Sequence, residues 1–424
     1  MKNFLLSLLT LALLLSACAP VEEPMSDSGY AQPTQPDTAH ELNPNVKPDQ
    51  LQALADGNTA FAVDFYHQIR SSDGNLVYSP LSLSLALSMT LSGARGETRD
   101  EMLQALSLTI LGDDLHPAFD ALMRAIKASE KADLEGSAGS KFQLNLINAI
   151  WPQIGEHFEQ DFLDGLAEHY GAGVNPVDYV NQLTTARKEI NDWVAQQTED
   201  KIQDLIPDDV LSTATRLVLT NAIYFNGSWA YPFLPDATQP APFTLLDGSQ
   251  VQVPMMTLPS GQLGYYQGEA FQAVSLPYLS RDFAMVLIVP DEGQFTNFEQ
   301  SLSSEALQST LSSLETQSLN LQMPKFDIET PVDAVLPLQN LGMLSAFGPA
   351  DFSGMTGTKE LFISDVVHKA TITVDEQGTE AAAATAVVMD KSMPMQLVID
   401  RPFLFTIVHQ PTGSILFMGR VLQP

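Results

Sequence analysis

The second half of the chain carries runs of strand-forming residues, and one unusually long link interrupts them near the C-terminus. β-Branched and aromatic residues concentrate in five runs: 216–227, 283–290, 318–326, 361–376 and 403–421. The last run contains the turn sequence QPTG and reads as a hairpin. Helical spacing lies mainly earlier, in 51–70, from Ser79 to near Gly93, from Thr98, and in 185–198. Helices first and strands later predict an α+β fold rather than alternating βαβ units.

The link between the last two runs spans residues 376–401, which is far longer than a usual connection within a domain. Such links are normally functional or disordered. This one begins EQGTEAAAATAVV and has no proline before Pro394. Gly378 could supply a hinge, and in an extended conformation one face would carry Thr379, Ala381, Ala383, Thr385 and Val387. A short helix would also explain the alanines, but not the length of the link. The composition therefore favours a segment that can join a sheet late.

The charge of the chain restricts its partners. Its 424 residues include 51 acidic and 20 basic ones, for a formal net charge of −31. A polyphosphate would be repelled, so we expect no nucleic-acid partner. The sequence also has no basic cluster that would suit a heparin-type cofactor.

A search for catalytic motifs finds none. The sequence contains no P-loop, no G-x-S-x-G, no H-E-x-x-H and no G-x-G-x-x-G before a helix. The seven histidines are scattered, and none pairs with another at metal-ligand spacing. A Ser–His–Asp site assembled from distant residues stays open at this level. We expect a protein that is not an enzyme and that has no metal and no cofactor.

The N-terminus has the form of a bacterial lipoprotein signal. A charged start, a short apolar run and small residues before a boundary indicate a signal peptide at residues 1–17. The ending LSAC resembles the bacterial lipobox, in which Cys18 would be lipidated; ordinary cleavage beside an incidental cysteine is the alternative. Residues 18–49 are rich in proline and acids, which predicts a disordered tether before a folded domain at 50–424. The expected location is extracytoplasmic, anchored to a bacterial membrane on its periplasmic or extracellular side.

Seven segments, in order along residues 50–424, resemble the serpin family. They are NLVYSPLSLSLALSMTLSGARGETRDEM, LTNAIYFNGSWAYPF, VSLPYLSRDFAMVLIVPDEG, LQMPKF, ADFSGM, LFISDVVHKATITVDEQGTE and RPFLFTIVHQPTGSILFMGR. The sixth runs into DEQGTEAAAATAV, which is similar nearly letter for letter to the reactive-loop hinge of inhibitory serpins. Any one segment is moderate evidence, whereas seven in family order are strong evidence.

The resemblance implies a metastable α+β domain with three β-sheets, eight or nine helices and an exposed reactive loop. It implies a monomeric serine protease inhibitor that acts as a suicide substrate. A serine protease of elastase-, subtilisin- or trypsin-like type would cleave the loop. The protease would then be trapped as an acyl-enzyme when the loop inserts into the main sheet. A serpin-fold binding module that does not inhibit is the alternative, and the absence of proline and of charge after Glu380 in the hinge favours inhibition.

The resemblance also assigns roles to single residues. The shutter, a buried hydrogen-bond network that controls opening of the main sheet, would consist of Ser79, Ser82, Asn221 and His368. The breach, where insertion begins, would contain Trp229 and Lys325, with Lys325 paired to Glu376. The hinge would comprise Glu376, Gly378, Thr379, Glu380, Ala381, Ala382, Ala383 and Ala384. From the residues alone, Trp229 would be an ordinary core aromatic residue, and His368 would be a core histidine whose ring nitrogens are hydrogen-bonded.

Two reference residues, Glu376 and Arg401, give positions for the reactive bond that differ by one residue. Counting forward from Glu376 by the family's spacing gives Ser392–Met393, and counting backward from Arg401 gives Lys391–Ser392. The number of residues between Glu376 and the reactive bond sets how much strand can insert before the protease is pulled. We therefore give the forward count more weight, and it favours Ser392–Met393. Ser392 suits a small apolar specificity pocket, whereas Lys391 suits a trypsin-like pocket with a carboxylate at its base.

Overall fold

The computed structural model describes residues 46–109, 111–136, 142–379 and 394–424. Six longer helices lie in its first half: α1 (Pro48–Ile69), α2 (Pro80–Leu91), α3 (Gly96–Ala105), α4 (Leu115–Gly136), α5 (Gln160–Tyr170) and α6 (Leu183–Gln197). Shorter ones follow among the strands: α7 (Phe295–Ser301), α8 (Ser304–Ser312), α9 (Val335–Asn340) and α10 (Ser353–Thr356). The described residues thus hold ten α-helices, against eight or nine expected, and α9 and α10 have only 6 and 4 residues.

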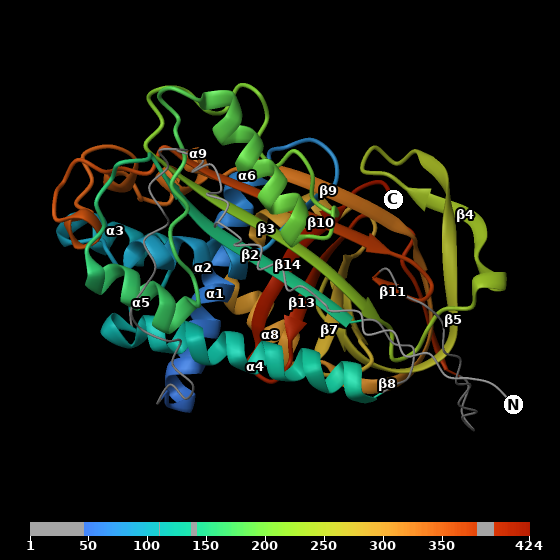
Figure 1. Cartoon of the computed structure of the whole chain (residues 1–424). Helices are drawn as coiled ribbons and strands as arrows, with labels where there is room; N and C mark the ends of the chain where they lie inside the picture. The colour runs from blue at the N-terminus through green and yellow to red at the C-terminus, as the bar shows by residue number, and fades with distance from the viewer. Residues whose placement is uncertain (1–45, 110, 137–141, 380–393) are drawn as a thin grey trace, which may run out of the picture. The chain divides into compact units, whose positions relative to one another are not determined.

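Five strands form what we call the main sheet (Figure 1). They are β2 (Phe142–Pro152), β3 (Leu217–Ser228), β9 (Phe326–Asp333), β10 (Asp365–Val374) and β11 (Gly378–Thr379). β3 lies between β2 and β10, and β9 lies on the far side of β10. The pairing of β3 with β10 is parallel, whereas β2–β3 and β9–β10 are antiparallel. The seam between β3 and β10 is therefore the one parallel junction in the described part of this sheet.

The other nine strands form a second sheet. They are β1 (Leu76–Tyr78), β4 (Gln239–Thr244), β5 (Gln250–Gln267), β6 (Phe271–Pro277), β7 (Phe283–Pro290), β8 (Glu315–Pro324), β12 (Met395–Val398), β13 (Phe403–His409) and β14 (Ser414–Val421). The 18-residue strand β5 pairs with β4 over its first part, with β8 from Met255 to Tyr265 and with β6 near its end. Two of the three expected sheets are therefore continuous through β5.

Helix α2 fills the space between the two sheets. Its start follows the sequence prediction: the Ser79 side chain accepts a hydrogen bond from the Ser82 N–H at 3.1 Å, and Pro80 occupies the first helical position. Every residue from Pro80 to Leu91 is buried. The helix contacts β2 and β3 on the main sheet and β14 on the second sheet. A helix buried on all sides belongs in a core, and this one underlies the seam.

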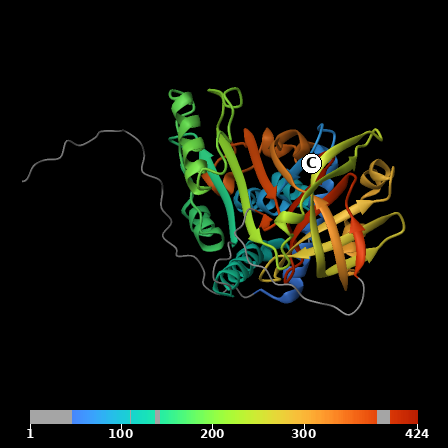
Figure 2. The same cartoon turned by 90° about the vertical axis from the view of Figure 1, so that its right-hand side faces the viewer.

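The main sheet is covered on both faces. Figure 2 shows α6 on the outer face and the helices near the N-terminus on the inner face, in agreement with the contacts that α6 and α2 each make with β2. The α+β prediction is confirmed, and the hairpin of β13 and β14 turns at the expected QPTG segment. The helix expected from Thr98 begins two residues earlier, at Gly96. The predicted runs did not include β2 and β5, nor the shorter strands β1, β4, β6, β9 and β12. Prolines and glycines inside β5 obscure its pattern.

Candidate functional site

At its end, β10 turns back on itself and leads directly into β11. The Asp375 N–H donates to the Gly378 carbonyl at 2.9 Å. The Asp375 carboxylate in turn accepts from the N–H groups of Gln377 and Gly378, at 2.8 and 3.2 Å. These three bonds close a tight turn, so the chain that follows β10 is directed back down the same sheet.

The two residues of β11 already occupy the start of a strand position. β11 runs antiparallel to the end of β3, with Thr379 opposite Gly227. β3 and β10 pair with each other only as far as Tyr224 and Thr371. Beyond that point β11 takes the place of β10 beside β3. An extended continuation of β11 would enter the seam antiparallel to both neighbours, which is a favourable arrangement for hydrogen bonding.

Close packing explains why glycine and a small side chain stand at this entrance. A Cβ atom on Gly378 would meet the carbonyl oxygen of Gly227 at 2.0 Å, so no other residue fits here without a shift of the backbone. Thr379 is 0% exposed, and its Oγ1 lies 2.9 Å from the hydroxyl of Tyr278. Gly378 and Thr379, two of the predicted hinge residues, therefore lie within the main sheet as β11.

Trp229 holds the turn through its side chain and its backbone. Its indole N–H donates to the Asp375 carbonyl at 3.0 Å, and its backbone N–H donates to the Gln377 carbonyl at 2.9 Å. Its ring stacks on Tyr278 with centroids 4.6 Å apart. The structure thus places Trp229, predicted at the breach, against the turn that connects β10 to β11.

Glu376 anchors the same turn by its side chain. Its Oε2 lies 2.6 Å from the ammonium of Lys325, as the sequence predicted, and its Oε1 accepts from the Thr238 hydroxyl at 2.5 Å. Burial acts to raise the pKa of this carboxyl, but the Lys325 ion pair and the Thr238 hydroxyl outweigh it. The pKa of Glu376 therefore lies below its ordinary value.

The four predicted shutter residues meet under the seam, and each is 0% exposed. The Ser79 N–H donates to Nε2 of His368 at 3.0 Å. The other ring nitrogen, Nδ1, bonds to the side-chain oxygen of Asn221, and the Asn221 amide donates to the Ser82 hydroxyl at 2.6 Å. His368 and Asn221 lie directly opposite each other on β10 and β3. Their bond consequently crosses the seam that an inserting strand would have to open.

This geometry sets the protonation state of His368. Because Nε2 accepts from a backbone N–H, the proton lies on Nδ1, which donates to Asn221. Burial is the largest effect, and it lowers the pKa of His368 to about 3. The ring is therefore neutral near pH 7, and every one of its polar atoms is hydrogen-bonded.

The structure adds one residue that the sequence reading missed. Asn148 lies opposite Asn221 in the β2–β3 pair, and its side-chain oxygen accepts from the Asn221 amide and, at 3.4 Å, from the Ser82 hydroxyl. It extends the shutter to β2. The alternation of apolar and polar residues from Phe142 to Leu146 is the strand signal that could have found this segment.

Several predicted positions lie outside the described residues. They are Cys18, the hinge residues Glu380, Ala381, Ala382, Ala383 and Ala384, and the reactive-bond candidates Lys391, Ser392 and Met393. Within the described ranges, no helix is both long enough and apolar enough to cross a membrane.

Comparison with known proteins assigns the family. The family model described as "Serpin (serine protease inhibitor)" matches residues 56–424. The chain is a serpin. Members of this family are generally protease inhibitors rather than enzymes, and the resemblance drawn from the seven segments is confirmed at the family level.

Relatives of this serpin occur in organisms as different as Thermococcus kodakarensis and Sus scrofa. An uncharacterized serpin-like protein of Thermococcus kodakarensis is 33% identical, over 100% of this chain and 99% of that protein. The leukocyte elastase inhibitor of Sus scrofa is 38% identical, over 88% of this chain and 100% of that protein.

Solved structures confirm the serpin fold. A tumour-suppressing serpin superposes with a TM-score of 0.78 at 26% identity, covering 88% of this chain and 100% of that one. Serpin48 of the insect Tenebrio molitor superposes with a TM-score of 0.74 at 32% identity, covering 88% of this chain and 98% of that one.

Proposed function

We propose that this serpin inhibits serine proteases as a suicide substrate. A protease would cleave the chain between β11 and β12, and the freed segment would insert between β3 and β10. The observation that carries the proposal is the position of β11. Its two residues already pair with the end of β3, just beyond the point where the β3–β10 pairing stops.

The sequence after β11 suits this movement. Residues 381–384 are alanines, which can pass between two covered strands without displacing the core on either face. Insertion would replace one parallel junction by two antiparallel ones and would add a strand's worth of hydrogen bonds. That gain would drive the movement of the acylated protease and distort its active site, so that deacylation fails.

The target we propose is an elastase-like or subtilisin-like protease that cleaves Ser392–Met393, with Lys391–Ser392 and a trypsin-like protease as the second choice. Two observations support the first choice. A seryl side chain suits a small specificity pocket, and relatives at 33–38% identity are named leukocyte elastase inhibitors. We also propose that the inhibitor acts as a monomer, held at an extracytoplasmic membrane surface through lipidated Cys18.

The test is to incubate the full chain with elastase, subtilisin, chymotrypsin and trypsin, and to analyse the products on denaturing gels. A protease–serpin complex that survives denaturation is the expected result with elastase or subtilisin. The mass of the released C-terminal peptide then identifies its first residue as Met393 or Ser392. Cleavage without a stable complex across the whole panel would contradict the inhibitory mechanism.

Heat stability gives an independent measurement. The cleaved chain, with its loop inserted, should melt well above the uncleaved chain, because the main sheet has gained a strand. An unchanged melting temperature after cleavage within the loop would favour a serpin fold that binds without inhibiting.

A further inference from the structure

An uncharged surface segment lies at the end of the main sheet opposite to β11. Residues 334–350, which include α9 and the short helix Ser345–Phe347, carry no charged side chain, although the whole chain has a net charge of −31. Leu336 and Leu344 in this segment are 63% and 59% exposed, more than any other large apolar side chain of the described residues. We call the surface of residues 334–350 the α9 face. Exposed apolar side chains that lie close together on a surface commonly mark a place of contact with another protein.

The pairing of the strands fixes the position of α9. The Ala334 N–H, directly before α9, donates to the Val366 carbonyl on β10 at 3.0 Å. Val366 is the second residue of β10, and Asp365 before it lies opposite Val218 at the start of β3. Figure 1 shows α9 at this end of β3 and β10, with β11 at the other end.

Leu344 is held at the same end of the sheet. The Ile363 N–H, just before β10, donates to the Ala346 carbonyl at 2.9 Å. The carboxylate of Glu101 on α3 accepts from the N–H groups of Leu344 and Ser345, at 2.9 and 2.6 Å. The backbone under the exposed leucine is therefore already ordered, which lowers the entropy cost of a contact made there.

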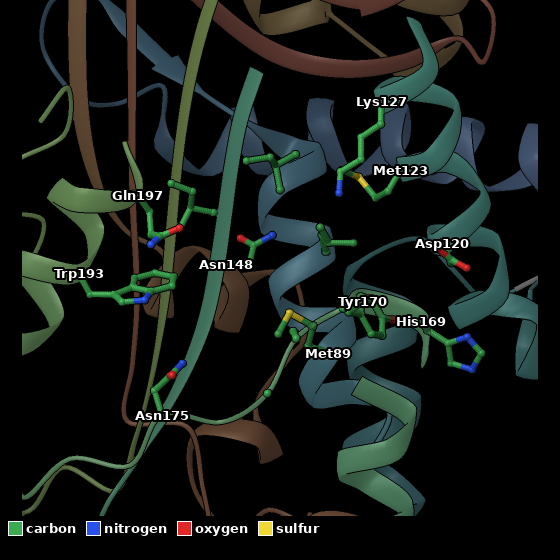
Figure 3. Close-up of a pocket in the computed structure, with 16 residues that line it drawn as sticks. Met89, Asp120, Met123, Lys127, Asn148, His169, Tyr170, Asn175, Trp193 and Gln197 are labelled. Carbon is green, nitrogen blue, oxygen red and sulfur yellow. The ribbon is translucent and has the colours of Figure 1, made fainter. Parts of the chain in front are cut away.

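The charges next to the α9 face lie at its two edges and are engaged within the chain. The carboxylate of Asp333 accepts from the Val335 N–H at 3.0 Å. Asp351 forms an ion pair with Lys359 at 2.6 Å. An uncharged centre with a polar rim is typical of a protein–protein contact. None of the residues of the α9 face lines the cavity beside β2 that Figure 3 shows.

The register of β11 indicates where an inserted loop would end, and this step rests on the proposed inhibitory function. Thr379 pairs with Gly227 in the antiparallel β11–β3 ladder. Continued in the same register, the loop would bring Met389 opposite Leu217, the first residue of β3. Ser392 would then lie three residues beyond the end of the sheet, or roughly 10 Å along the chain. A protease acylated on Ser392 would consequently arrive at the end of the sheet where α9 lies.

We propose that the α9 face contacts the trapped protease and stabilises its distorted state. A protease whose active site has been pulled apart exposes apolar side chains that its own core normally covers. Leu336 and Leu344 offer these side chains an apolar surface on which no charge has to be desolvated. The ester to Ser392 makes the contact intramolecular, so that even a weak contact is formed. Because the α9 face binds the distorted protease better than the intact one, it shifts that equilibrium and slows hydrolysis of the ester.

The test measures how fast the complex breaks down. Breakdown adds water to the ester, which frees the serine hydroxyl of the protease and leaves a carboxylate on Ser392. The full chain is reacted with elastase or subtilisin, the stable complex is purified, and the return of protease activity is followed. Leu336→Ser and Leu344→Ser should form as much complex as the wild type, because cleavage and entry of the loop take place at the other end of the sheet. Each variant should then release active protease about fivefold faster, as expected when part of a leucine side chain loses its contact.

The matched control is Leu246→Ser. Leu246 is 53% exposed on the turn between β4 and β5 of the second sheet, so the substitution removes a similar apolar side chain away from the α9 face. Its complex should break down at the wild-type rate. The melting temperatures of the three uncleaved variants should equal that of the wild type, because the removed side chains are exposed.

Hydrogen exchange gives a second measurement on the wild type. The amides of residues 334–350 should exchange at least threefold more slowly in the complex than in the chain cleaved in its loop without a bound protease. Equal breakdown of the wild type and both α9-face variants would overturn the proposal, as would equal acceleration by Leu246→Ser or unchanged exchange. In each of these cases the stable complex itself would still support inhibition. Absence of any stable complex with the wild type would instead disprove the inhibitory function and, with it, the contact at the α9 face.

Discussion

The seam between β3 and β10 is held differently at the breach, just beyond its end, and at the shutter, in its middle. At the breach, β11 has replaced β10 beside β3. The contacts there are glycine packing, one hydroxyl pair, the Trp229–Tyr278 stack, the Trp229 hydrogen bond to the turn and the partly exposed Lys325–Glu376 ion pair. At the shutter, β3 and β10 still pair, and the His368–Asn221 bond crosses between them within a buried polar network. A buried hydrogen-bond network in a low-dielectric interior resists partial opening. In the proposed mechanism, β11 already occupies the entrance, and we expect the shutter to form the barrier to insertion.

The largest effect should come from placing a charge at the entrance. Thr379→Arg puts a guanidinium at a position that is 0% exposed and packed against Gly227. An unpaired buried charge costs several kcal/mol, so the entering strand should be expelled and the inhibitor should become a substrate. The measurement is the ratio of stable complex to cleaved chain after reaction with elastase. Thr379→Ser, which keeps the hydroxyl, is the control and should inhibit normally. Stable complexes at the wild-type ratio with Thr379→Arg would show that the seated entrance is not required.

A second prediction distinguishes the effect of the shutter on the free energy of unfolding from its effect on the rate of loop insertion. His368→Ala leaves the Ser79 N–H and the Asn221 oxygen buried without partners, and should lower the free energy of unfolding by about 2–4 kcal/mol. It should also speed spontaneous conversion to the inserted form, because the bond across the seam is lost.

The matched control is His409→Ala. His409 is equally buried, on β13 of the second sheet, and bonds to Ser129 and Thr412. It should lower the melting temperature without speeding conversion, which is measured as the appearance of a heat-resistant fraction on storage. Equal conversion rates in the two variants would place the barrier elsewhere than at the shutter.

The shutter and the breach should also respond to pH at different values. Burial lowers the pKa of His368 from 6.5 to about 3, so its contribution to stability is complete above pH 6.5 and is lost as the pH falls toward 3. The loss is about 1.4 kcal/mol per pH unit, or about 2 kcal/mol between pH 6.5 and 5. The carboxyl of Glu376 has a lowered pKa, so its contribution is present above the ordinary value of 4.5 and is lost only below that range. The shutter should therefore weaken first.

Comparing the unfolding free energies of the wild type and His368→Gln from pH 7 to 4.5 measures this difference. Asp365 acts in the opposite direction in both proteins, since burial and then Asp333 raise its pKa to about 6. Its contribution is lost as the pH rises through 6, and it cancels in the comparison. Parallel pH profiles for the two proteins would mean that His368 is not buried neutral.

The smallest effect should come from the ion pair at the breach. The side chain of Lys325 is 38% exposed, so solvent screens its pair with Glu376. Lys325→Met should cost about 0.5–1 kcal/mol of unfolding free energy, measured by denaturant titration at low salt, with most of the difference gone at 1 M salt. A loss as large as that of His368→Ala would mean that the breach and the shutter hold the seam equally.

The sequence by itself determined the family, the α+β order of elements, the start of α2 at Ser79 and Pro80, and the residues that meet at the shutter and the breach. These could be predicted because they depend on local signals: caps, runs of strand-forming residues, and segments that keep their family order. The alanine run and Gly378 likewise indicated a segment able to join a sheet.

Only the tertiary structure decided how far that segment has already joined. No local pattern shows that Thr379 is buried beside Gly227, that β5 joins two of the expected sheets, or that Asn148 extends the shutter to β2. Each of these depends on the register and packing of strands far apart in the chain. A shift of one residue in a strand would turn every such side chain to the other face, and the local sequence does not fix that register.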